Sequence, residues 1–147
     1  MKVKKSKRMA CTVLWSIAIL SLAALAGCGG DKMNKPEGSA LSGDAIKALI
    51  IGNTVDGAIG AQVFSYYYKS AVSVSGTIGM DGDDDNGTWN IKDNDVYCNE
   101  WISFFDGVQR CYKWYKTERG YILENVDSFR TQPLVVTGIR EGNPLGF

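Results

Sequence analysis

The character of this chain changes at residues 53–80, which read NTVDGAIGAQVFSYYYKSAVSVSGTIGM. β-Branched and aromatic residues dominate here, and glycine or a short polar residue interrupts them about every ten residues. The same spacing continues along the chain, so we expect strands at 53–59, 61–69, 71–80, 87–92, 95–104, 109–117, 120–127 and 134–140. Most connections are too short for parallel crossovers. The sequence therefore predicts a mainly β fold, an antiparallel meander of about eight strands.

Strands joined by tight hairpins bury one apolar face when the sheet closes or bends strongly. We expect a lipocalin-like barrel or a strongly curved sheet, with a small open β-sandwich as the alternative. One short N-terminal helix should precede the strands, because Ser42 can cap it and Asp44 suits its first turn. Its apolar stripe would consist of Ala45, Ile46, Leu49 and Ile50, and Gly52 would end it. So short a helix is unstable alone and must dock on the sheet.

The amino terminus has the layout of an export signal. Residues 1–8 hold five basic residues and no acidic one, an apolar run follows over 9–26, and residues 25–28 read LAGC. This segment resembles the lipobox of bacterial lipoproteins. The resemblance implies cleavage before Cys28, attachment of a diacylglycerol to its thiol, and usually acylation of the new amino group. The alternative is an uncleaved transmembrane anchor, for which the apolar run is just long enough.

Three parts are therefore expected: a lipoprotein signal peptide at 1–27, a lipidated flexible tether at 28–40, and a single β domain at 41–147. The tether is polar and glycine-rich, as flexible spacers are. Two or three acyl chains would hold the protein firmly on a membrane. Gly29, rather than Asp, follows Cys28, which favours the outer membrane in bacteria that have two. We expect a lipid-anchored envelope protein that faces the periplasm.

Charge and composition exclude several functions. Removal of residues 1–27 takes away five basic residues and no acidic one, which leaves eleven basic against sixteen acidic residues. An acidic chain is repelled by phosphates, so nucleic acid is not an expected partner. The chain has no histidine, which excludes Ser-His-Asp and Cys-His catalysis and imidazole metal sites. No cofactor is implied.

Export makes a disulfide the expected state of Cys98 and Cys111, the two cysteines that remain after Cys11 and Cys28 are accounted for. If they face each other across a hairpin, the turn is centred between Phe104 and Phe105. The turn-forming dipeptide Asp106-Gly107 instead centres it two residues later, a register in which a disulfide cannot reach. We favour an asymmetric loop that keeps the disulfide over two unbridged cysteines.

Two other groups of side chains are candidate sites. Asp81, Asp83 and Asp85 lie in a run of four carboxylates that could bind calcium, but the EF-hand pattern fails at its sixth and twelfth positions. A solvated hairpin turn over 81–86 is the preferred interpretation.

Aromatic side chains could line a ligand cavity, and the candidates are Tyr67, Trp89, Trp101 and Trp114. A barrel of this size has room for one small ligand or for its own side chains, and the second is the preferred interpretation. Because neighbouring residues in a strand alternate, Tyr66, Tyr67 and Tyr68 cannot all face inward.

A set of spaced glycines, aromatic residues and cysteines runs through residues 41–147. Its members are Gly52-Asn53-Thr54, Phe64, Tyr67, Gly76, Gly87-x-Trp89, Cys98-x-x-Trp101, Cys111 and Gly142-Asn143-Pro144. This set resembles a family of small exported proteobacterial proteins, a domain of unknown function. The family has no assigned catalytic residues, so the resemblance implies no site. Lys69-Ser70-Ala71 replaces the family's commoner Asp-Gly turn, which affects a strand boundary rather than the fold.

These observations favour a non-catalytic envelope lipoprotein whose β domain binds a protein or another envelope component. One alternative is a carrier that holds a small apolar ligand inside the barrel. Another is a hydrolase built on carboxylates such as Glu100, Glu118 and Glu124.

Overall fold

The computed structural model describes residues 37–80, 82–127 and 132–147, all within a compact unit that extends from Asn34 to Phe147. The predicted signal peptide, Cys28 and most of the predicted tether lie outside the described residues. In the part that is described, no helix is long and apolar enough to cross a membrane.

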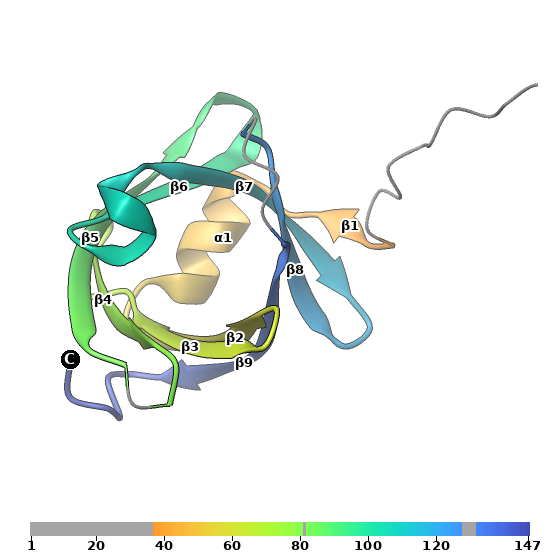
Figure 1. The fold of residues 1–147 in the computed structure, drawn as a ribbon. Helices are drawn as coiled ribbons and strands as arrows, with labels where there is room; N and C mark the ends of the chain where they lie inside the picture. The colour runs from red at the N-terminus through yellow and green to blue at the C-terminus, as the bar shows by residue number, and fades with distance from the viewer. Residues whose placement is uncertain (1–36, 81, 128–131) are drawn as a thin grey trace, which may run out of the picture. The chain divides into compact units, whose positions relative to one another are not determined.

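Eight strands close into a barrel, as the sequence predicts (Figure 1). Strands β2 to β9 pair antiparallel in sequence order, and β9 pairs with β2. The open β-sandwich alternative is therefore wrong. The elements are β1 (Ser39–Ala40), α1 (Gly43–Ile50), β2 (Asn53–Ile59), β3 (Gln62–Tyr67), β4 (Ser73–Ile78), β5 (Asp84–Lys92), η1 (Asp93–Asp95), β6 (Val96–Trp101), η2 (Phe104–Gly107), β7 (Arg110–Thr117), β8 (Gly120–Asn125) and β9 (Leu134–Glu141).

Antiparallel order gives the barrel two distinct ends. We call one the helix end: it holds α1 and the connections that follow β3, β5 and β7. We call the other the η2 end: it holds the connections that follow β2, β4, β6 and β8, including η2 itself.

Helix α1 lies within the ring of strands in Figure 1 and closes the helix end. The Ser42 hydroxyl accepts a hydrogen bond from the Ala45 amide (3.2 Å), which confirms the predicted cap. Ile46 and Ile50 are completely buried, so the helix docks its apolar stripe as expected. At its start, the Gly43 amide donates to the Asp95 carboxylate (2.7 Å), which joins the helix to η1.

Strand β1 extends the sheet outside the barrel. Ser39 and Ala40 pair with Lys116 and Tyr115 of β7. This edge of β7 is open because β6 pairs only with the first three residues of β7. The last two residues of the predicted tether are therefore part of the sheet, a contact that their polar, glycine-rich surroundings do not predict.

The turn predicted over 81–86 is wrong in its boundaries. Strand β5 already begins at Asp84, and the described residues of the connection before it include the left-handed Gly79 (φ 91°). Asn86 and Gly87 are part of the strand, not a left-handed turn. The strand extends because Asp85 faces inward opposite Gly76 and finds hydrogen-bond donors there, so its carboxylate needs no solvent.

Glycines make room for large rings inside the barrel. A Cβ on Gly76 would lie 2.6 Å from Cδ1 of Tyr66, and a Cβ on Gly87 would lie 3.2 Å from Cδ2 of Trp101. The rings of Tyr66 and Trp101 therefore lie over backbone that carries no side chain. Strand alternation holds along β3: Tyr66 is buried, whereas Tyr67 is half-exposed.

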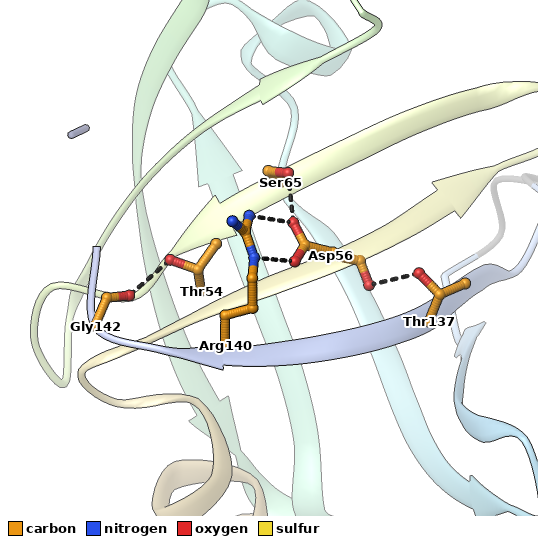
Figure 2. Close-up of polar contacts among 6 residues, drawn as sticks. All are labelled: Thr54, Asp56, Ser65, Thr137, Arg140 and Gly142. Atoms are coloured by element: carbon orange, nitrogen blue, oxygen red, sulfur yellow. Dashed lines mark hydrogen bonds and ion pairs between the residues drawn. The ribbon is translucent and has the colours of Figure 1, made fainter. Parts of the chain in front are cut away.

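The closing seam between β2 and β9 is held by polar contacts on its outer surface (Figure 2). Arg140 donates to both carboxylate oxygens of Asp56, from Nε (2.6 Å) and Nη2 (2.8 Å), and the Ser65 hydroxyl adds a third hydrogen bond (2.6 Å). Burial raises the pKa of Asp56, but the hydrogen bonds from Arg140 and Ser65 and the Arg140 charge outweigh it, so the pKa is lowered. Nearby, the Thr54 hydroxyl donates to the Gly142 carbonyl (2.7 Å).

Candidate functional site

The barrel interior is packed with aromatic rings. Towards the η2 end, Phe64, Tyr66, Trp101 and Phe104 form a chain of contacts with centroid distances of 4.5, 4.6 and 5.2 Å. A second group lies around Tyr97, whose ring contacts Tyr68, Trp89, Tyr112 and Trp114. All of these side chains except Phe104 are buried, so the rings themselves fill space that a ligand would need.

The predicted aromatic ligand site is only partly assembled. Trp89, Trp101 and Trp114 are all inside the barrel, with 3%, 2% and 1% of their surface exposed. Trp89 and Trp114 are linked through the ring of Tyr97, at 5.9 Å from each. Tyr67 is on the outer surface and does not join them, because it alternates with the buried Tyr66.

Tyrosine hydroxyls bring polar atoms into this interior. Tyr68 and Tyr97 share a hydrogen bond between their hydroxyls (2.9 Å). Burial raises the pKa of both, and it raises the pKa of Tyr112 to about 12. These phenols are therefore neutral at physiological pH and act as hydrogen-bonding groups rather than as bases.

Cys98 and Cys111 form a disulfide, as predicted. They are directly opposed in the β6–β7 pairing, with Cα atoms 4.1 Å apart. The asymmetric loop is confirmed, because Asp106 and Gly107 lie in η2 and are left-handed without setting the register. The bridge faces away from the inward row of Tyr97 and Tyr112, so it braces the outer surface.

The carboxylates proposed for calcium do not converge. Asp81 lies outside the described residues, Asp83 is exposed, and Asp85 is 6% exposed and faces inward. Nowhere in the described ranges do three or more potential metal ligands cluster.

The Asp85 carboxylate instead binds backbone. Its Oδ2 accepts from the amides of Ser103 and Phe104, each at 2.8 Å, and its Oδ1 accepts from Asn86 (2.8 Å). Burial raises the pKa of Asp85, but these three donors outweigh it and the pKa is lowered. The charged side chain therefore fastens η2 to the barrel wall, a role that the acidic run did not suggest.

Apolar side chains form a band on the outer surface of the barrel, and we call Val63, Ala58, Val135 and Ile122 the apolar band. They belong to β3, β2, β9 and β8, and each is directly opposed to the next across a strand pair. Val63 is 48% exposed and Val135 is 42% exposed. Single exposed apolar residues are ordinary, but a continuous row across four strands marks a surface suited to contact.

A groove of about 760 Å³ adjoins this band. The apolar band residues Ile122 and Val135 line it together with charged residues of both signs. The remaining lining residues are Glu37, Gly38, Ser39, Lys116, Thr117, Glu118 and Arg119. The groove is therefore formed by the β7–β8 hairpin, by β9 and by the segment through which the chain enters the domain.

The carboxylates named for hydrolysis do not face one interior site. Glu100 is exposed on β6 opposite Thr88, and Glu118 is exposed in the β7–β8 connection. Glu124 is half-buried on β8 and is opposed to Lys113.

A scan against protein-family models gives no match for this chain, and searches of curated proteins and of solved structures also give none. The resemblance to an exported proteobacterial family therefore stays a prediction. The class that the fold defines is a closed eight-stranded antiparallel meander barrel with one short N-terminal helix and an extra strand outside.

The apolar band is not among the features predicted from the sequence, although the sequence contains a signal for it. Tyr121-Ile122-Leu123 and Leu134-Val135-Val136 are runs of three apolar residues in strands. Alternation forces the middle residue of each run outward when its neighbours face the core. The same alternation turns Tyr67 outward between Tyr66 and Tyr68.

Proposed function

We propose that this protein is a non-catalytic envelope lipoprotein, anchored through lipid on Cys28 and facing the periplasm, whose barrel binds a protein partner at the apolar band and the adjoining groove. The observation that carries the proposal is the continuous apolar row from Val63 to Ile122, in which Val63 and Val135 are exposed, on a barrel whose interior is already filled by its own rings. Binding of a protein partner then uses the outer surface.

The charges around the groove favour a protein over a uniformly anionic partner. Lys116 and Arg119 lie beside Glu37 and Glu118, so the rim carries both signs. A rim of mixed charge around an apolar centre is typical of protein interfaces. Nucleic acid or an anionic headgroup layer would instead select a row of basic residues.

The disulfide supports the location outside the cytoplasm. Disulfides persist in oxidising compartments such as the periplasm and are rare in the cytosol. The Cys98–Cys111 bridge is consistent with the export signal read from the amino terminus.

Site-specific photocrosslinking in intact cells tests the binding proposal. A photoreactive residue at Val63 or Val135 should capture the same single protein, and one at Thr88, exposed on the opposite wall of the barrel, should capture none. Val135→Asp should lower capture from Val63 at least tenfold, because it places a charge in the centre of the band. Equal capture from Thr88, or no effect of V135D, would refute the proposal.

Membrane fractionation tests the anchor separately. Cys28→Ala should leave the precursor unlipidated. The mass of the variant protein should therefore include no acyl chains, whereas the mass of the wild-type protein from the membrane fraction should include them. A wild-type mass spectrum that shows an unmodified chain retaining residues 1–27 would contradict the lipid anchor without touching the binding proposal.

A further inference from the structure

The η2 turn covers one mouth of the barrel with two half-buried rings, Phe104 and Phe105. The Phe104 ring lies 5.2 Å from the ring of Trp101, which in turn lies 4.6 Å from Tyr66. One aromatic side chain therefore separates this buried cluster from the η2 end.

Two hydrogen-bond donors under this cover lack partners. Within the described part of the chain, neither the Tyr66 hydroxyl nor the Trp101 indole nitrogen has a hydrogen-bond partner, although both residues are 98% buried. Buried donors are nearly always paired, so such atoms call for an explanation. The other two buried indoles differ from each other: the Trp89 indole donates to the Ser70 carbonyl at 2.9 Å, whereas the Trp114 indole nitrogen also has no partner among the described residues.

The cover itself is strained, and a few side-chain contacts hold it: besides Asp85, Phe104 packs on Trp101 and the Arg110 guanidinium lies 5.7 Å from the centre of the Phe105 ring. Phe105 (φ 55°) and Asp106 (φ 59°) are left-handed, a conformation that costs free energy for residues other than glycine. The Asp85 carboxylate holds the turn through the amides of Ser103 and Phe104. A short strained segment with so few contacts can exchange with an open form at modest cost in free energy.

We propose that η2 is a lid over a binding site for a neutral aromatic carbonyl compound. The ligand's ring replaces Phe104 against Trp101, and its carbonyl oxygen accepts the hydrogen bond that the Trp101 indole lacks. A carbonyl oxygen is an acceptor that brings no donor of its own, so it suits an unpaired indole N–H. The ligand is neutral because the Asp85 carboxylate lies beside the lid and would repel an anion.

Indole resonances of the mature lipidated chain, recorded at one detergent concentration, test this site. Addition of 2-acetylnaphthalene should move the Trp101 indole N–H downfield, and the Trp89 indole should not move. The matched compound 2-ethylnaphthalene, which has no acceptor, should leave both unmoved. An unmoved Trp101 resonance, or equal shifts with both compounds, would overturn the proposal, as would a resident water found on the Trp101 indole.

Variants separate the lid from the site. Asp85→Asn and Asp85→Ala should lower the apparent dissociation constant about tenfold, because the open form becomes more populated. Trp101→Phe keeps an aromatic ring, although a smaller one than the indole, and removes the donor, and it should weaken binding about tenfold. If D85A does not fold, D85N still decides the matter, since unchanged affinity in D85N would contradict a lid. Because every variant is measured at the same detergent concentration, the fraction of ligand that enters micelles is the same for all of them.

Discussion

The two ends of the barrel are closed in different ways. At the helix end, α1 inserts two completely buried isoleucines and joins η1 through the Asp95 carboxylate. At the η2 end, a short strained turn covers the mouth and depends on the Asp85 carboxylate. Apolar burial of a whole helix turn is lost only when the domain unfolds, whereas a hydrogen-bonded latch can open locally. The difference indicates that the helix end is a structural closure, and that the η2 end is the one that we propose can open.

The largest expected effect is at the helix end. Ile50→Ala should lower the free energy of unfolding by about 2–5 kcal/mol, because it removes a fully buried side chain and leaves a cavity. Urea unfolding of the wild type and of Ile50→Ala measures this difference. Ile51→Ala is the matched control: Ile51 is 39% exposed and should cost less than about 0.5 kcal/mol. Equal costs for the two isoleucines would mean that α1 is not a closure.

The disulfide should contribute the next largest effect. Replacing both Cys98 and Cys111 with Ala should lower the free energy of unfolding by about 3 kcal/mol, because the bridge closes a short loop in the unfolded chain. Unfolding of the wild type with and without reductant should give the same difference. Alkylation of either cysteine in the unreduced protein would show that the bridge is absent.

At the η2 end, Asp85→Ala should lower the free energy of unfolding by about 2 kcal/mol. Its main effect should be on the η2 turn itself. Amide exchange at Ser103 and Phe104 should accelerate, while exchange in α1 should not change. Asp84→Ala is the matched control, because Asp84 is exposed on the same strand. An Asp85 variant that loosens α1 as much as η2 would contradict independent closures.

The pH dependence of η2 follows from the same carboxylate. The pKa of Asp85 is lowered in the folded state, so its stabilisation is complete above the ordinary aspartate pKa of 3.8. It is lost as the pH falls below that value through the folded pKa. In the wild type, the protection of the Ser103 and Phe104 amides, measured relative to their intrinsic exchange rates, should therefore fall below pH 3.8. In Asp85→Ala, which has already lost the carboxylate, the protection of these amides should not fall over the same pH range.

The smallest effect should come from the seam, which lies between the two ends. Arg140→Lys keeps the charge but loses the two-pronged contact with Asp56, so the unfolding midpoint should fall slightly at neutral pH. The pKa of Asp56 is also lowered, so the difference should vanish as the pH falls below 3.8. A difference that persists after Asp56 is protonated would assign it to packing instead.

Strand spacing was enough to predict the meander and the order of its strands, because local turn residues and alternation determine both. Strand β2, Asn53–Ile59, is predicted to the residue. Two features were out of reach because they depend on distant partners: the inward turn of Asp85 and the addition of β1 to β7.

The candidate site was harder to predict than the fold. Trp89, Trp101 and Trp114 were expected inside, and burial follows from alternation. The acidic run has the composition of a solvent-exposed turn. Nothing near it in the sequence indicates that the amide of Ser103, eighteen residues later, binds the Asp85 carboxylate. The orphan donors of Tyr66 and Trp101 can be recognised only once the packing around them is known.

Native-state hydrogen exchange of the mature chain tests the unequal closure of the two ends most directly. The amides of Ser103 and Phe104 should exchange through a local opening that is insensitive to low denaturant. The amides of Ile46 and Ile50 should exchange only through global unfolding, with a strong denaturant dependence. Equal protection and equal denaturant dependence at the two ends, or faster exchange in α1, would contradict the account.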